Sequence, residues 1–288
     1  MARKNPPNVR GKIVAITGGA RGIGRATATA FATAGAKVAI GDLDVELAEK
    51  AAMDIGNATN AQVVGLPLDV TQPSSFDQFF TDAEAALGPI DVLINNAGIM
   101  PTGLFLDEEP SATDRMIDIN LRGVITGSRL AARRFADRGR GVIVNVASLA
   151  GVSGFAGLAT YCGTKHAVIG FSEGLAGEMR DHGVAVTVVL PGVVRTELSA
   201  GADLPKWMEP VASVDPEDVA KAMVAAVDSG KFRVTVPAQL GAVLFAMSLM
   251  PRRMRLWTEG VTGMDRAFVT TDAESRERYH RRIFGGAH

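Results

Sequence analysis

Short runs of β-branched and other apolar residues alternate along the chain with alanine-rich stretches of helical length. Most of the apolar runs are continuous, as expected for strands that are covered on both faces. The predicted strands are Lys12–Thr17, Lys37–Asp42, Gln62–Pro67, Ile90–Asn95, Gly141–Ala147, Val184–Leu190 and Arg233–Val236. The predicted helices are Gly22–Ala34, Asp44–Ile55, Pro73–Leu87, Ala112–Arg138, Ala159–His182 and Pro216–Ser229. Six successive strand-to-helix alternations predict an α/β fold with one doubly wound parallel sheet of about seven strands.

No internal repeat or linker divides this pattern. We therefore expect a flexible lead-in over residues 1–10, one domain over residues 11–237 and a C-terminal helical extension over residues 238–288. The extension begins with an almost wholly apolar segment, Ala238–Met250, which is followed by Arg252, Arg253 and Arg255. Two interpretations stay open: a helix that packs on the core or on a neighbouring subunit, or an element that rests on a membrane surface or admits a lipid-like substrate. The apolar segment is shorter than the ~20 residues that a membrane-spanning helix needs.

Composition and charge narrow the functional classes. The formal charge of −1 gives no broad preference for nucleic acid or an anionic membrane. The single cysteine, Cys162, excludes an internal disulfide, and the four histidines show no metal-ligand spacing, so we expect no metal site. The N-terminus has no apolar signal segment, so a reduced, cytoplasmic compartment is expected.

The first predicted strand is followed by a glycine-rich turn that leads directly into a helix. The turn reads Thr17-Gly18-Gly19-Ala20-Arg21-Gly22-Ile23-Gly24. Glycines let the backbone turn sharply and approach a pyrophosphate, whose charge is favoured at a helix N-terminus. The glycine spacing differs from the widespread GxGxxG pattern, but the strand before it and the helix after it are those that a phosphate loop requires. We predict that this loop, with Gly18, Arg21, Gly22, Ile23 and Gly24, binds a dinucleotide.

The second predicted strand ends at Asp42, which bears on the choice of cofactor. A carboxylate there can accept hydrogen bonds from an adenosine ribose and repels a 2′-phosphate, which favours NAD. Arg21 in the glycine loop argues the other way, because a cation could pair with that phosphate. The sequence predicts NAD, with NADP as the alternative.

Further motifs identify a family. They are Thr17-Gly18-x3-Gly22-x-Gly24, Asn95-Asn96-Ala97-Gly98, Asn120, Ser148, Tyr161-x3-Lys165 and Pro191-Gly192-x-Val194-x-Thr196. In this order and spacing, the chain resembles the single-domain branch of the short-chain dehydrogenase/reductase family over roughly Gly11–Pro237. The resemblance implies a Rossmann-type fold and hydride exchange between a nicotinamide cofactor and a carbonyl or alcohol. It also implies that Asp69 and Val70 lie at the adenine, that Asn96, Ala97 and Gly98 line the cofactor, and that Pro191, Gly192, Val194 and Thr196 complete its site, with Val194 and Thr196 at the nicotinamide end.

Tyr161, Lys165 and Ser148 carry the predicted chemistry. Reducing a ketone with a hydride leaves an alkoxide, so an acid must deliver a proton. Tyrosine has an ordinary pKa of about 10, and a lysine ammonium one helical turn away favours the tyrosinate, so we expect Lys165 to lower the pKa of Tyr161. The Ser148 hydroxyl can hydrogen-bond the substrate oxygen, and Asn120 in this family helps to organise a water near the lysine. Both lysine and tyrosine also belong to the predicted cofactor contacts.

The predicted substrate walls are Ala150–Leu158, with Val152, Phe155 and Leu158, and Leu198–Pro210, with Leu198, Leu204, Trp207 and Met208. These walls are mainly apolar, and the first has no Arg or Lys that would pair with a carboxylate. We therefore expect a neutral, hydrophobic secondary alcohol or ketone, and a homodimer or homotetramer.

Other functions have weaker support in the sequence. One alternative is an NADPH-dependent ketoreductase of acyl or biosynthetic type, and another is a non-catalytic redox sensor that binds a dinucleotide. The segment Gly170-Phe171-Ser172-Glu173-Gly174 matches the GxSxG pattern of serine hydrolases. It lies inside a predicted helix rather than at a strand-to-helix turn, which argues against a hydrolase.

Overall fold

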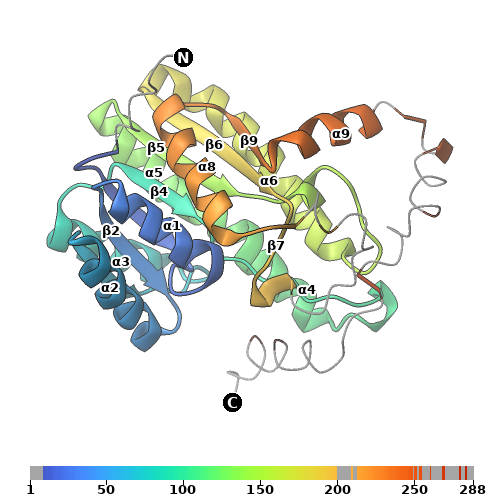
Figure 1. The fold of residues 1–288 in the computed structure, drawn as a ribbon, viewed down its shortest axis with the longest axis horizontal. Coiled ribbons are helices and arrows are strands. Elements are labelled where there is room, and N and C mark those ends of the chain that lie inside the picture. Colours follow the sequence, from blue (N-terminus) through green and yellow to red (C-terminus); the bar gives the residue numbers. More distant parts are fainter. Residues whose placement is uncertain are drawn as a thin grey trace.

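The computed structural model describes residues 9–199, 209, 213–248, 250–251, 253–254, 260, 268–269, 279 and 283. Its centre is a parallel sheet of seven strands in the order β3-β2-β1-β4-β5-β6-β9 (Figure 1). The strands are β1 (Ile13–Thr17), β2 (Lys37–Asp42), β3 (Val63–Pro67), β4 (Val92–Asn95), β5 (Gly141–Val146), β6 (Val184–Pro191) and β9 (Arg233–Val236). The predicted doubly wound α/β sheet is therefore confirmed.

Helices cover both faces of this sheet (Figure 1). They are α1 (Gly22–Thr33), α2 (Val45–Thr59), α3 (Pro73–Leu87), α4 (Pro110–Ile117), α5 (Val124–Arg138), α6 (Ala159–Met179) and α8 (Pro216–Ser229). Successive side chains of a strand point to opposite faces. Val14 and Ile16 accordingly pack in the cluster that includes α1, α2 and α8. Ile13 and Ala15 pack in the other cluster, with α3, α5 and three phenylalanines of α3 at its centre. The continuous apolar strands of the sequence thus fill two cores.

The strand order reverses between β1 and β4, because the chain moves outward from β1 to β3 and then returns to the other side of β1. In open α/β sheets, the crevice beyond the carboxyl ends of the strands at such a reversal is where ligands bind. The fold therefore brings the loops after β1, β2, β4, β5 and β6 to one edge.

The predicted helix Ala112–Arg138 is wrong as a single element. The structure divides it into α4, a π-helical turn at Asp118–Gly123 and α5. Asn120, inside the turn, bonds the backbone of Ile99 through both ends of its amide, so a contact from outside the helix accompanies the irregularity.

Smaller differences have local causes. Helix α2 continues past Ile55 to Thr59, and it ends where Asn60 adopts a left-handed φ of 57°. Two-residue strands β7 (Val193–Val194) and β8 (Ser213–Val214), which the sequence did not predict, pair with each other beside the main sheet.

The C-terminal extension begins with helix α9 (Ala238–Ser248), which follows β9 directly and extends away from the sheet (Figure 1). Gly241 of α9 lies against Thr235 of β9. Further along, the described residues Phe268, Tyr279 and Ile283 are buried. Within the described part of the chain, no helix has both the length and the apolar character required to cross a bilayer.

Candidate active site

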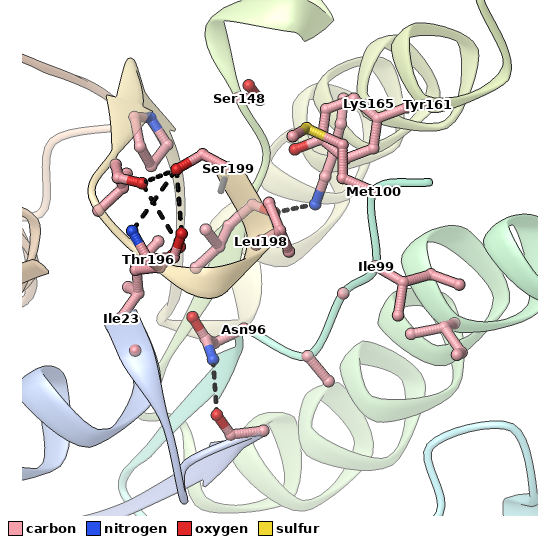
Figure 2. A pocket seen from close by; sticks show the side chains of 18 of the residues that line it. Ile23, Asn96, Ile99, Met100, Ser148, Tyr161, Lys165, Thr196, Leu198 and Ser199 are labelled. Atoms are coloured by element: carbon pink, nitrogen blue, oxygen red, sulfur yellow. Dashed lines mark hydrogen bonds between the residues drawn. The ribbon is translucent and has the colours of Figure 1, made fainter. Parts of the chain in front are cut away.

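A cavity of about 1800 Å³ opens at the carboxyl edge of the sheet. All of the predicted site residues line it except Gly24 and Asn120. Figure 2 shows Ser148, Tyr161 and Lys165 at this cavity, together with Asn96, Ile99 and Met100 from the segment after β4 and Thr196 and Leu198 from the segment after β6. Ligand pockets usually have volumes of roughly 300–1,000 Å³, so this cavity has room for a dinucleotide and a second molecule.

The glycine loop forms one end of the cavity. Gly18 has φ +63°, and a Cβ atom there would lie 2.9 Å from Cα of Ala97. A Cβ atom on Gly24 would lie 2.1 Å from the Gly18 carbonyl oxygen. The absence of a side chain at Gly24 therefore allows the first turn of α1 to pack directly on the loop, and Gly24 itself does not line the cavity. The Asn96 amide holds the loop by donating to the carbonyl oxygens of Thr17 and Gly18, both at 3.0 Å.

The N-terminus of α1 follows this loop, and no side chain of α1 competes with a ligand for the N–H groups of its first turn. Arg21 occupies the N-cap position, its side chain makes no cap hydrogen bond, and the first turn contains no acidic residue. The N–H groups of that turn are therefore not occupied by a side-chain cap, and they carry the partial positive charge that attracts phosphate.

Asp42 is fixed at the end of β2. One carboxylate oxygen accepts the Ala20 N–H at 3.1 Å and the other accepts the Asp44 N–H at 3.2 Å. Arg21 forms an ion pair with Asp44 at 2.5 Å, in which both side chains are nearly half exposed. The cation of the glycine loop is thus paired with an aspartate, and a second aspartate lines the cavity beside it.

A buried polar network connects β4 to its neighbours. Asn95 donates to Asn145 at 2.8 Å and to Ser128 at 3.1 Å, and Asn145 donates to Ser172 at 2.9 Å. Ser172, the serine of the GxSxG match, is therefore buried in α6 and holds the sheet rather than lying at a strand-to-helix turn. The structure agrees with the sequence-based rejection of a hydrolase.

Tyr161 and Lys165 lie one turn apart near the start of α6. Both side chains are buried, with 6% and 4% exposed, and both line the cavity. The Lys165 ammonium donates to the Val146 carbonyl oxygen at 3.0 Å, and its Nζ atom lies 5.7 Å from the centre of the Tyr161 ring. Ser148 follows β5, and its hydroxyl accepts the Ala150 N–H at 3.1 Å.

Burial determines the protonation of this pair. It raises the pKa of the Tyr161 phenol above its ordinary value, and a hydrogen bond with the Ser148 side chain lowers that pKa in part. Burial also lowers the pKa of Lys165 to about 8. The expectation that Lys165 lowers the pKa of Tyr161 is not met, because desolvation outweighs every other influence on the phenol and Lys165 is not among the groups that shift it.

Asn120 lies behind the cavity instead of lining it. Its amide oxygen accepts the Ile99 N–H at 2.8 Å, and its amide nitrogen donates to the Ile99 carbonyl at 2.9 Å. Gly98 lies between Asn120 and Lys165: a Cβ atom on Gly98 would be 3.2 Å from the Asn120 amide oxygen and 3.6 Å from the Lys165 Nζ atom. A side chain at this position would therefore crowd the Asn120 amide oxygen.

Comparison with known proteins identifies the family. The family model described as short chain dehydrogenase matches residues 12–206, about two thirds of the chain. The chain belongs to the short-chain dehydrogenase/reductase family. It is therefore an NAD(P)-dependent oxidoreductase that acts on CH–OH groups.

Individual relatives agree with this assignment. The chain is 34% identical to 2,5-dichloro-2,5-cyclohexadiene-1,4-diol dehydrogenase LinX of Sphingobium indicum, over 82% of this chain and 89% of that protein. It is 35% identical to 3-oxoacyl-[acyl-carrier-protein] reductase FabG of Escherichia coli, over 67% of this chain and 77% of that protein. A crystal structure of a short-chain type dehydrogenase/reductase from Mycobacterium marinum superimposes with a TM-score of 0.73 at 30% identity, covering 79% of this chain and 94% of the other.

The residues at the cavity fit the nicotinamide dinucleotide that this family binds. The uncapped N-terminus of α1 suits the pyrophosphate, and Asp42 lies where a ribose would meet β2. At the other side, a Cβ atom on Gly22 would approach Cγ2 of Thr196 to 3.3 Å, so the glycine loop and the segment after β6 meet at this end of the cavity.

The substrate side of this dehydrogenase/reductase differs in part from the sequence prediction. Phe155, Leu158 and Leu198 line the cavity as predicted. Val152 does not; it packs in a separate cluster with Val168 and its neighbours, because its loop turns that side chain toward α6. Leu204, Trp207 and Met208 lie outside the described residues.

Sequence reasoning missed several lining residues of this family member. They are Ile99, Met100, Ser111, Asp114, Arg115, Asp118, Ile119, Leu240, Val243, Phe268 and Ile283. The first two directly follow the Asn-Asn-Ala-Gly motif, so their distance from that motif could have identified them. Phe268 and Ile283 carry no local signal, since only the folded chain brings them to the cavity.

Proposed function

We propose that this protein transfers a hydride between NAD(H) and a neutral, hydrophobic secondary alcohol or ketone, with Tyr161 as the general acid and base. The observation that carries this proposal is the meeting of the Tyr161 phenol and the Ser148 side chain at a cavity with largely apolar walls. A carbonyl oxygen between the two hydroxyls would receive two hydrogen bonds, while its apolar substituents would contact Phe155, Leu158 and Leu198.

The proton chemistry follows from burial. In the reductive direction a bound reduced nicotinamide would supply the hydride for the carbonyl carbon. Tyr161 then donates its phenolic proton to the oxygen, and Ser148 orients that oxygen by donating a hydrogen bond. The Tyr161 phenol is protonated at neutral pH, since burial raises its pKa further, and it can donate this proton to the more basic alkoxide that hydride transfer would leave. Lys165, with its pKa lowered to about 8, is close enough to neutrality to return a proton to the phenolate.

Asn120 supports the proposed chemistry by positioning the segment beside Lys165. By clamping the backbone of Ile99, Asn120 fixes the segment that lines the cavity beside Lys165. In this role Asn120 holds the segment in place and helps to organise a proton path to Lys165.

The choice of NAD rests on the carboxylates around the glycine loop. A 2′-phosphate at the end of β2 would meet Asp42, and it would have to draw Arg21 away from Asp44. Exposed ion pairs contribute only about 0–1 kcal/mol, so the Arg21 pair alone would not prevent NADP binding. Asp42, whose two oxygens are held by backbone N–H groups, is the stronger determinant.

A second candidate substrate carries an acidic group. Arg115 of α4 lines the cavity, and its buried Nε atom has no hydrogen-bond partner among the described residues. A carboxylate, or an acyl group with an acidic carrier, could pair with the Arg115 guanidinium at the cavity wall. Arg115 is the feature that supports this alternative of acyl type, and a comparison of matched neutral and carboxylate ketones distinguishes it from the neutral substrate.

The direct test is turnover of a panel of apolar ketones and alcohols with NADH, NAD, NADPH and NADP, followed at the absorbance of the reduced nicotinamide. Tyr161→Phe should lower kcat by about 10²–10⁴-fold, since it removes the proton donor. Its affinity for NADH, measured by fluorescence, should stay within about twofold of the wild type. Unchanged turnover in Tyr161→Phe would exclude the catalytic role, and tight NADH binding without turnover of any panel member would favour the redox sensor.

The remaining sequence-based expectations stay predictions. They are the cytoplasmic location, the homodimer or homotetramer, the domain limits and the contact with a membrane or lipid through the C-terminal extension. Sedimentation of the full chain would give the subunit number.

A further inference from the structure

Three aromatic and aliphatic side chains of the C-terminal extension lie in the same apolar cluster as Tyr161. Phe268, Tyr279 and Ile283 are each less than 10% exposed, and they pack there with Ile99 and Met100. More than a hundred residues of sequence separate these three from Tyr161. The extension therefore reaches the part of the cavity where the proposed proton transfer takes place.

Phe268 is seated on the loop that leads from Ser148 to Tyr161. Its ring meets that of Phe155 edge to face, with centroids 5.8 Å apart and planes at 67°. Gly157, with φ +82°, lies so close that a Cβ atom there would be 2.5 Å from the Phe268 carbonyl oxygen. Backbone thus packs directly on backbone, which a side chain at this position would prevent.

Tyr279 fastens the extension to the other side of the cavity. Its hydroxyl oxygen accepts the Met100 N–H at 2.9 Å, and Met100 itself lines the cavity. Tyr279 does not belong to the lining, whereas Phe268 and Ile283 do. The Tyr279 hydroxyl therefore fixes Met100 from outside the cavity, and the side chains of Phe268 and Ile283 form part of the cavity surface.

We propose that the C-terminal extension builds a substrate subsite in which Phe268 and Ile283 receive a bulky apolar group on one side of the reacting carbonyl, with Tyr279 as the positioning residue. This inference rests on the proposed oxidoreductase function and names its substrate class: ketones and alcohols with an aryl or branched alkyl substituent. Small ketones react at Tyr161 without using this subsite.

The chemistry of the wall supports this class. Phe155 and Phe268 present ring surfaces from two segments, and aromatic groups pack favourably edge to face on such surfaces. Ile283 adds an aliphatic surface. A polar or charged substituent placed there would lose hydration without gaining a hydrogen bond from these three side chains.

The test compares butanone with benzylacetone, which share a methyl ketone and differ in an aryl group. One methylene in an apolar pocket changes kcat/KM by roughly 10–200-fold. Phe268→Ala and Ile283→Ala should therefore lower kcat/KM for benzylacetone at least about tenfold, mainly through KM, and change that for butanone less than about threefold. Phe268→Leu should restore part of the loss. Val269→Ala, next in the chain and absent from the lining, is the matched control.

Tyr279→Phe keeps the ring and removes the acceptor for the Met100 N–H. It should raise KM for benzylacetone several-fold while KM for butanone and NADH affinity stay near the wild-type values. Equal losses for both ketones in these variants, or none for benzylacetone, would overturn the subsite.

Calorimetric binding of benzylacetone to the full chain loaded with NAD provides a readout that does not depend on turnover, because the oxidised cofactor has no hydride to transfer to a ketone. If the wild type binds benzylacetone more tightly than butanone and Phe268→Ala abolishes the difference, the subsite stands even when neither ketone is reduced, and only the proposed reaction fails. Equal binding of both ketones by the wild type overturns the subsite.

Discussion

Lys165 shows how a single side chain couples the chemistry of the site to the stability of the fold. Its ammonium is buried near the start of α6 and donates to the Val146 carbonyl at the end of β5. Removing this charge from water is unfavourable, which is why its pKa falls to about 8. A lysine poised for proton transfer is therefore a lysine that destabilises the protein in its charged form.

The pH dependence of unfolding should reveal this cost. Unfolded lysine has a pKa of about 10.4, so between pH 8 and that value the unfolded chain binds more protons, and stability rises with pH in this window. At pH 7 the full penalty is present. Lys165→Met should therefore unfold at higher denaturant than the wild type at pH 7, by about 1–3 kcal/mol, while losing activity.

The gap between Lys165→Met and the wild type should narrow as the pH rises from 8 to 10. Lys221→Met, on the exposed side of α8, serves as the control and should change stability by less than about 0.5 kcal/mol. A gap that is constant or widens with pH would contradict a neutralised, buried lysine.

At the scale of elements, close backbone contacts decide how helices lie on the sheet. Gly65 of β3 faces α2, and a Cβ atom there would lie 2.4 Å from the backbone of both Ala48 and Glu49. Neither neighbour can move without displacing the helix. The pairing of α2 with β3, which precedes the loop that carries Asp69, therefore depends on the absence of a side chain.

Gly65→Ala should lower the free energy of unfolding by about 1–3 kcal/mol or more, because it forces α2 away from the sheet. Gly56→Ala is the matched control in the same unit. Its Cβ atom would meet the Ala61 carbonyl at an ordinary 3.5 Å, and alanine favours a helix interior by up to about 1 kcal/mol. Urea titrations of the two variants should thus move in opposite directions; a stabilised Gly65→Ala would refute the contact.

The elements also show what the sequence can predict. Continuous apolar strands and glycine turns carry their own signal, and the seven strands lie within one or two residues of the predicted ranges. The π-helical turn at Asp118–Gly123 has no such signal in its own sequence, because the hydrogen bonds that accompany it join Asn120 to the distant Ile99. The motif residues that line the cavity could be predicted because their spacing is visible in the sequence. Phe268, Ile283 and Arg115 could not, because only the folded chain brings them to the cavity.

For the whole molecule, the cavity makes the cofactor a structural component. Its lining includes residues of the loops that follow β1, β2, β3, β4, β5 and β6. A ligand that contacts all of these loops stabilises the folded state by mass action, by about 2.7 kcal/mol at a hundred times its dissociation constant. The effect provides a measure of cofactor choice that requires no substrate.

NADH at saturating concentration should raise the unfolding midpoint by about 5–10 °C. On the proposed cofactor preference, NADPH at the same concentration should raise it less, because Asp42 would repel the 2′-phosphate. Asp42→Asn should increase the response to NADPH. Asp77→Asn is the control: Asp77 pairs with Arg134, and neither residue lines the cavity. A larger shift with NADPH than with NADH in the wild type would reverse the proposed cofactor preference.

The contact between Gly157 and Phe268 joins parts of the chain with different tasks. Every residue predicted to meet the cofactor precedes position 200, whereas Phe268 and Ile283 come from the last stretch of the chain. A recombination event that replaced only the coding region for residues 238–288 would therefore exchange the part of the cavity wall formed by Phe268 and Ile283 and leave the residues predicted to meet the cofactor unaltered. With this arrangement, substitutions in a single segment of the gene can change the substrates of the enzyme while the rest of the gene stays constant.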